Sequence, residues 1–232
     1  VPWLINKVIL EYAPYIGSIE DEVWKWAEKI DEKATKQLKE YYPSVQDGQE
    51  PSYYFCAYSI ECSSCGKRLP LSNRWWFHQE SSSKGHAFRP HPTEDKVEYE
   101  HVYLPDDVTK DDFDPTEGTV SGGDATCPSC GVVTESDDVK SKLRSDNFEY
   151  EICGVKYTGT SSNADDGFRA PTEKDREAFE KAAERIENDI DLATLLTSEI
   201  PEGNKTKEPR NYGVTEWRET LNPRQFLSQA VY

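Results

Sequence analysis

Apolar residues in the N-terminal part of this chain follow a helical spacing. Residues 2–12 are apolar on nearly every side of a helix that ends before Pro14, which predicts a helix buried on more than one face. Over 19–41, apolar residues recur every three or four positions, and Ser18 stands where a helix cap is expected. Charged side chains fill the opposite face. We therefore expect this second helix to pack its apolar face into the core and to end at Pro43.

A helical spacing returns in the C-terminal part of the chain. Thr172 can cap a helix whose first turn is acidic, and alanine, phenylalanine and isoleucine residues then share one face. Asn222 followed by Pro223 is typical of a helix start, with the proline in the first turn. The pattern predicts one helix from Thr172 and a terminal helix from Pro223.

The middle of the chain is rich in aromatic and β-branched residues, which favours strands. We expect strands in the aromatic run 53–60, around 97–104, in 132–134 and in 150–157. Residues 69–71 together with 74–77 are expected to form the second strand of a ribbon hairpin. Glycine, serine and proline gather over 81–92 and predict a loop. Residues 93–117 hold ten acidic residues against two lysines, so most of this stretch outside the strand is expected to be a solvated loop.

Two Cys-x-x-Cys-Gly motifs are the strongest chemical signal in the sequence. They consist of Cys62 and Cys65 before Gly66, and of Cys127 and Cys130 before Gly131. Four thiolates in two such pairs suit a closed, tetrahedral structural zinc site, and each glycine lets the backbone turn its amides toward sulfur. Plain zinc ribbons separate their pairs by about 15–20 residues, whereas 61 residues separate Cys65 from Cys127 here. The sequence predicts a zinc ribbon with a long insertion between its knuckles; the alternative is two unrelated knuckles or disulfides.

The remaining cysteines and the composition narrow the class of protein. Cys56 and Cys153 are left over, and Cys56 is expected to be a small buried residue in its aromatic run. Cysteines with metal-site spacing, no signal peptide and no long apolar run predict a cytoplasmic protein without a membrane span. The chain has no methionine and begins at Val1, which favours a piece of a longer protein.

The formal net charge of −17 at pH 7 is opposite to that of most free-standing nucleic-acid binders. One local stretch differs, because Lys67, Arg68 and Arg74 lie close to Trp75 and Trp76. Basic residues beside aromatic ones can hold phosphates and stack on bases, so these five residues are candidate nucleic-acid contacts. The alternative is that both tryptophans pack the ribbon against the helices while the charges are solvated.

Familiar catalytic and nucleotide-binding patterns are missing from the sequence. It contains no glycine-rich phosphate loop and no Ser-His-Asp or Cys-His arrangement with supporting context. The four histidines all fall between the two knuckles, and their spacing matches no helical metal-binding pattern. We expect no catalytic residue in this chain and no metal ligands besides the four knuckle cysteines.

Several short strings occur in a definite order along the chain. They are residues 1–7, Tyr41-Tyr42-Pro43, the two knuckles with Trp75-Trp76 after the first, Arg169-Ala170-Pro171-Thr172, and Asn222-Pro223-Arg224-Gln225. In this order they resemble a family of large prokaryotic adenine-specific DNA methylases, in which a four-cysteine zinc module is inserted between the two halves of the methylase domain. The resemblance spans nearly the whole chain apart from residues 81–120.

The resemblance implies a parent protein that binds S-adenosylmethionine and methylates the exocyclic amino group of adenine in DNA, with the base flipped into a pocket. The glycine-rich cofactor loop and the Asp/Asn-Pro-Pro-Tyr/Phe motif of that family are absent here, and the nearest string, 112–115, lacks the second proline and the aromatic residue. The segment is expected to be catalytically silent. Its expected partners are DNA and the remaining methyltransferase domain, and its expected use is DNA contact or target selection.

Together these patterns predict an α+β fold, with a β-rich zinc ribbon flanked by amphipathic helices and inserted in a larger α/β methyltransferase. The expected parts are a helical anchor over 1–43, the zinc-ribbon module with its acidic insertion over 44–170, and a helical return segment over 171–232. The main alternative is a stand-alone acidic zinc-ribbon module that binds other proteins. A zinc-ribbon part of a transcription or translation machine is the third.

Overall fold

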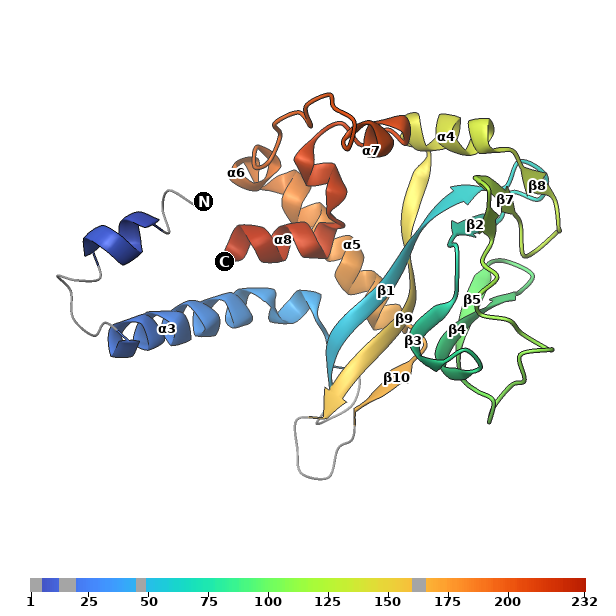
Figure 1. Ribbon diagram of the computed structural model, residues 1–232, viewed down its shortest axis with the longest axis horizontal. Helices are drawn as coiled ribbons and strands as arrows, with labels where there is room; N and C mark the ends of the chain where they lie inside the picture. Colours follow the sequence, from blue (N-terminus) through green and yellow to red (C-terminus); the bar gives the residue numbers. More distant parts are fainter. Residues whose placement is uncertain (1–5, 13–19, 45–48, 160–165) are drawn as a thin grey trace.

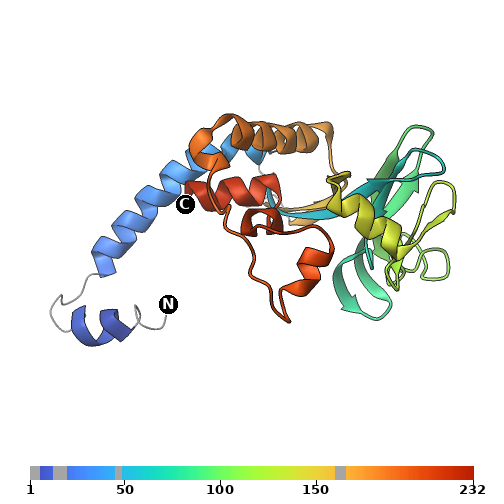
Figure 2. The same ribbon diagram turned by 90° about the horizontal axis from the view of Figure 1, so that it is seen from above.

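The computed structural model describes residues 6–12, 20–44, 49–159 and 166–232. Helices come from both ends of the chain and gather on one side, while antiparallel sheets from its middle form the other side (Figures 1 and 2). The predicted α+β class is confirmed. The predicted cap at Ser18 lies outside the described residues.

A four-stranded antiparallel sheet of order β10-β9-β1-β2 joins the two sides. Its strands are β1 (Gln49–Glu61), β2 (Arg68–Leu71), β9 (Phe148–Gly159) and β10 (Gly167–Arg169). The strands predicted at 53–60, 69–71 and 150–157 are confirmed. β1 and β9 pair along almost their whole length, so residues about a hundred positions apart in sequence form the backbone of the molecule.

A second sheet of order β3-β4-β5 is formed by the insertion between the knuckles. Its strands are β3 (Trp76–Ser81), β4 (Lys84–Pro92) and β5 (Val97–Leu104). The strand expected around 97–104 is confirmed. The loop predicted over 81–92 is wrong, and so is the assignment of 74–77 to the ribbon hairpin, since Trp76 and Phe77 belong to this second sheet.

The prolines of β4 do not disturb its pairing, which explains why the loop prediction failed. β3 pairs with β4 only as far as Ala87, and the Phe88 amide donates to the Trp75 carbonyl on that same side. Pro90 and Pro92 lie two and four residues further along, so their missing amide hydrogens fall on the side where β3 has already ended. Their other side still pairs with β5.

The ribbon tip is a third, small sheet followed by a short helix. It comprises β6 (Val120–Ser121), β7 (Asp124–Thr126), β8 (Val133–Thr134) and α4 (Ser136–Arg144). The strand predicted at 132–134 is confirmed. The helix α4 is not among the predicted elements, because its mostly polar residues bury only Val139 and Leu143.

The helix predicted over 2–12 lies partly outside the described residues. The helices predicted over 19–41, from Thr172 and from Pro223 are present. They are α3 (Glu20–Leu38), which continues as the 3-10 turn η2 (Lys39–Tyr41), α5 (Glu173–Asn188) and α8 (Pro223–Val231). Shorter elements are η1 (Val8–Tyr12), α6 (Ile190–Ala193), α7 (Lys207–Asn211) and η3 (Trp217–Thr220). Capping boxes start α5 at Thr172 and α8 at Asn222, as their sequences predict. Among the described helices, none combines the length and apolar character that crossing a bilayer requires.

The N-terminal and C-terminal helices share one core. Ala34, Leu38 and Tyr41 are buried against Ala182 of α5 and Leu227 of α8. The helical anchor and the helical return segment therefore pack together as a single layer beside the four-stranded sheet (Figure 1).

The burial expected for the N-terminal helices is wrong for most of α3 and for most of the residues described before it. Trp24 and Trp26 of α3 are 62% and 60% exposed, and Leu10 is 75% exposed. The cause is geometric, because α3 extends well beyond α5 and α8 and only its last turns meet them (Figures 1 and 2).

Candidate metal centre

The two knuckles meet in space although 61 residues lie between them. Each occupies the turn of a hairpin, the first between β1 and β2 and the second between β7 and β8. The Sγ atoms of Cys62 and Cys130 are 3.7 Å apart, those of Cys65 and Cys127 are 3.8 Å apart, and all four lie within 4.8 Å of one another. A tetrahedral zinc ion with zinc–sulfur distances of about 2.3 Å places its ligands about 3.8 Å apart. The four predicted ligands thus form one cluster whose spacing fits a single zinc ion.

The two knuckles have the same backbone conformation. The amide of Gly66 donates to the Cys62 carbonyl at 2.9 Å, and the amide of Gly131 donates to the Cys127 carbonyl at 2.8 Å. The two glycines have φ angles of 72° and 73°, in the left-handed region that disfavours a side chain. Glycine is therefore required after each cysteine pair for the turn that brings the sulfurs together.

The two buried cysteines of the cluster, Cys62 and Cys127, differ in the direction in which their pKa is shifted. Burial opposes ionisation of Cys62, but hydrogen bonds from the amides of Cys65 and Ser64 and from neighbouring thiols outweigh it and lower the pKa of Cys62 to about 7. At Cys127 burial dominates and raises the pKa to about 12. A bound zinc ion ionises its thiol ligands, so it would supply the charge that both buried sulfurs need.

A small apolar core holds the metal ligands in place. Cys62 and Cys127 are buried with Ile60, Leu69, Ala125, Val139 and Leu143, which come from the central sheet, the ribbon tip and α4. Because this core is small, the ion would join elements that have little other apolar contact, which is the usual role of a structural zinc.

The two other cysteines lie apart from the metal cluster. Cys56 is half-buried and Cys153 is fully buried. Burial raises the pKa of Cys56 to about 11 and raises that of Cys153 well above its ordinary value. Neither thiol is poised to react near neutral pH, because the reactive form is the thiolate.

The tryptophans of the candidate nucleic-acid patch are inside the protein. Trp75 is 2% exposed and packs near Tyr99, and Trp76 is 6% exposed and packs against Val102 and Leu104. Buried rings cannot stack on bases, so the structure corresponds to the packing alternative. Trp75 packs between the insertion and the central sheet, where it meets Ala57 and Cys153, and Trp76 packs within the insertion. Neither ring packs the ribbon against the helices, although that alternative predicts it.

The basic residues of that patch are mostly engaged by the protein itself. The Lys67 ammonium donates to the Thr93 carbonyl at 2.7 Å, and Arg68 forms an ion pair with Glu149. Arg74 is exposed, and its guanidinium has no hydrogen-bond or ion-pair partner among the described residues. The five predicted contacts therefore do not form one accessible surface, and Arg74 is the one that remains open to a partner.

Three histidines come together in a way the sequence does not reveal. His78, His86 and His101 lie on neighbouring strands of the second sheet, and Nδ1 of His86 is 3.0 Å from Nε2 of His101. Phe168 of β10 stacks on this pair, with ring centroids 4.0 Å apart for His86. The pairing of β3, β4 and β5 brings these histidines together, so their spacing in the sequence does not show that they are neighbours. Within the described residues, the four cysteines are the one group of three or more potential ligands that cluster tightly enough for a metal.

Comparison with known proteins adds no relative. No protein-family model, no curated protein and no solved structure matches this chain. The resemblance to adenine-specific DNA methylases accordingly stays a prediction, and function is argued from the geometry of the molecule.

Proposed function

We propose that this chain is the zinc-bearing segment of an S-adenosylmethionine-dependent, adenine-specific DNA methyltransferase. In this proposal the helices anchor the segment to the remaining methyltransferase domain, and the ribbon serves DNA contact or target selection. Zinc is structural, because four cysteines complete a tetrahedral site and leave no position for a reacting group. S-adenosylmethionine binds the parent protein and not this segment.

The observation that carries the proposal is the uneven exposure of large apolar side chains. In the described parts of 1–43 and 171–232 these include Val23, Trp24, Trp26, Ile30, Ile190, Leu196 and Trp217. The described part of 44–170 exposes only Tyr53, Val132 and Val133. Large apolar patches usually mark a surface that another protein part covers. The helical layer has the character of a surface buried against a further domain.

Contacts between the segments on either side of the β-rich module support an insertion. Before β1, the Tyr41 carbonyl accepts a hydrogen bond from Arg224 at 3.3 Å, and the Tyr42 hydroxyl lies 2.7 Å from the Ser228 hydroxyl. Arg224 and Ser228 both belong to α8, at the other end of the chain. The segments before and after the module thus pack on each other, as expected when a module is inserted into a frame that both segments form.

A second candidate function is a stand-alone acidic module that binds protein. It is favoured because most of the candidate nucleic-acid contacts are not available to DNA. Both tryptophans are buried, and Lys67 and Arg68 are bound to other groups of the protein. The net charge of −17 would then attract a basic protein surface instead of repelling DNA. Both candidates need the same structural zinc.

The native coding sequence on both sides of the segment separates the two candidates. A glycine-rich loop just upstream of Val1 and an Asp/Asn-Pro-Pro-Tyr string downstream of Tyr232 would support the methyltransferase. A start codon directly before Val1 and a stop codon directly after Tyr232 would refute it.

DNA contact by the ribbon is tested in the parent protein. Arg74→Ala should weaken its affinity for duplex DNA and reduce the salt dependence of binding, whereas Lys67→Ala removes a cation that the protein already uses and should change affinity less. Equal affinity of the Arg74→Ala variant and the parent would exclude a role for this part of the ribbon.

A further inference from the structure

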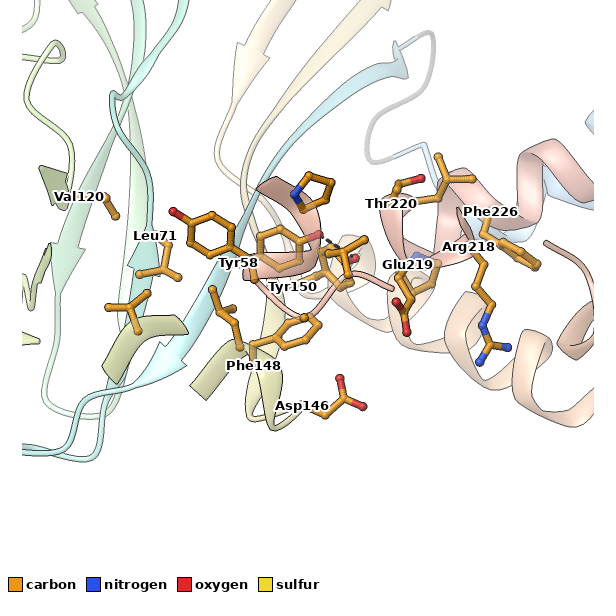
Figure 3. A pocket seen from close by; sticks show the side chains of 18 of the residues that line it. Tyr58, Leu71, Val120, Asp146, Phe148, Tyr150, Arg218, Glu219, Thr220 and Phe226 are labelled. Carbon is orange, nitrogen blue, oxygen red and sulfur yellow. Dashed lines mark hydrogen bonds between the residues drawn. The ribbon is translucent and has the colours of Figure 1, made fainter. Parts of the chain in front are cut away.

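A cavity of about 740 Å³ lies between the zinc ribbon and the C-terminal segment (Figure 3). Its size is within the range of pockets that hold small molecules, about 300–1,000 Å³. The central sheet, the ribbon tip and α4 line one side, and α5, the segment around η3 and the start of α8 line the other. A cleft of this size with a largely apolar lining is a candidate site for a small molecule.

Three aromatic rings form the floor of the cavity. The ring of Tyr58 lies 4.9 Å from that of Tyr150 and 5.2 Å from that of Phe148, and the two tyrosine hydroxyls are 3.3 Å apart. Leu71 continues the floor toward the ribbon, and Phe226 closes the opposite end (Figure 3). Burial raises the pKa of Tyr150, so this ring stays uncharged near neutral pH. Such a surface favours a flat, apolar ring.

The mouth of the cavity is negatively charged. Glu219 lines the cavity, but the amides of Thr215 and Glu216 already donate to it. Asp146 lies two residues after α4 and Glu187 lies in the last turn of α5, so each of these two exposed carboxylates stands near the negative end of a helix dipole. Neither carboxylate has an ion-pair or hydrogen-bond partner among the described residues. The one cation of the lining, Arg218, is already bound to Glu216 at 2.8 Å and to the Ala193 carbonyl at 3.0 Å.

We propose that this cavity binds a small, flat aromatic cation or protonated aromatic amine. Its ring would lie on Tyr58 and Tyr150, and its positive group would meet Asp146 and Glu187 at the mouth. An anion of similar shape would face two carboxylates and two helix C-terminal ends, which disfavours it. This inference goes beyond the function proposed above and does not rest on it.

The test uses the zinc-loaded chain and two planar probes of opposite charge. Proflavine is a flat aromatic cation at neutral pH, and 1-anilinonaphthalene-8-sulfonate is an anion. Isothermal titration calorimetry should show one proflavine bound per chain, more weakly at higher salt. The anion should bind at least about tenfold more weakly. The two unpaired carboxylates at the mouth attract the cation and repel the anion, so their electrostatic contribution to the two affinities has opposite sign.

Two kinds of variant locate the binding. Leu71→Trp fills the floor and should abolish proflavine binding, while the double variant Asp146→Asn and Glu187→Gln changes only the mouth and should weaken it about tenfold. The surface variant should fold normally even if Leu71→Trp does not, and circular dichroism with zinc analysis checks both. The matched control, Trp24→Ala with Trp26→Ala, removes exposed aromatic rings elsewhere and should leave the affinity unchanged.

Three results would overturn the proposal. The first is that proflavine does not bind, and the second is that both probes bind with equal affinity. The third is that the Trp24 and Trp26 control loses proflavine binding while the variant with Asp146→Asn and Glu187→Gln binds proflavine like the unmodified chain.

Discussion

Replacing Trp75 with alanine tests how the insertion between the knuckles is held to the rest of the molecule. The ring is 2% exposed and belongs to a cluster with Val97 and Tyr99 of β5 and Cys153 of β9. It therefore joins the second sheet to the central one. Removing it leaves a cavity at this junction, because the backbone around it is held by the pairing of both sheets.

The expected cost follows from the buried area. An aromatic side chain buries about 150–250 Å², which at about 25 cal/mol per Å² corresponds to roughly 4–6 kcal/mol as an upper bound. Measured losses for buried aromatic residues replaced by alanine are about 3–5 kcal/mol, and we expect Trp75→Ala to fall in this range. Trp24 is 62% exposed, so Trp24→Ala should change the free energy of unfolding by no more than about 0.5 kcal/mol.

Equilibrium unfolding in urea, followed by circular dichroism at saturating zinc, gives both numbers. Circular dichroism is preferred to fluorescence because the substitutions remove fluorophores, and saturating zinc keeps the metal contribution constant. An unchanged midpoint for Trp75→Ala would refute the burial argument. A loss for Trp24→Ala equal to that for Trp75→Ala would refute the distinction between the two sites.

Three further predictions concern the metal site, the buried ion pair of Arg169 with Asp175, and the close approach of Gly154 to the ring of Phe88. Cys130→Ser should abolish tight zinc binding and unfold the ribbon, measured as zinc content and thermal unfolding. Arg169 donates to the buried carboxylate of Asp175 at 2.6 Å, and although burial alone would raise the pKa of Asp175, hydrogen bonds hold it below its ordinary value. Asp175→Asn should therefore lower the free energy of unfolding by about 3–5 kcal/mol at pH 7, measured by urea unfolding. A carboxyl whose pKa is lowered by folding contributes its full stabilisation only above its pKa in the unfolded chain, near 3.9. The difference in stability between the variant and the unmodified chain should therefore shrink below about pH 4. Gly154→Ala should cost about 1–3 kcal/mol in the same assay, because the added β-carbon would overlap the buried ring of Phe88.

Each of these predictions has a matched control in the chain. Cys56→Ser changes a thiol outside the metal cluster and should leave zinc content unaltered. Glu173→Gln removes an exposed carboxylate next to the same helix start and should show little pH-dependent difference. Gly203→Ala adds a β-carbon where the nearest neighbour is a flexible threonine side chain. Full zinc retention by Cys130→Ser, a pH-independent loss for Asp175→Asn, or equal losses for the two glycine variants would each contradict the corresponding reasoning.

Local signals in the sequence determined the helices, several strands and the identity of the metal ligands. Thr172 and Asn222 stand at the starts of α5 and α8 because a cap acts on the amides of the next few residues. The turn of each knuckle likewise depends only on its own two cysteines and the following glycine. These features involve short stretches of chain, so the sequence alone is sufficient to predict them.

Tertiary structure decided which segments meet. The β4 strand forms despite Pro90 and Pro92 because no strand of the described residues pairs with the side on which their amide hydrogens would lie. Trp75 is buried and Trp24 exposed although each is a tryptophan beside a basic residue, since burial depends on which distant elements reach them. The cavity next to Tyr58 is lined by the central sheet on one side and by the C-terminal segment on the other, so it depends on how these parts meet. Such relations depend on the relative placement of segments far apart in sequence, which local spacing does not encode.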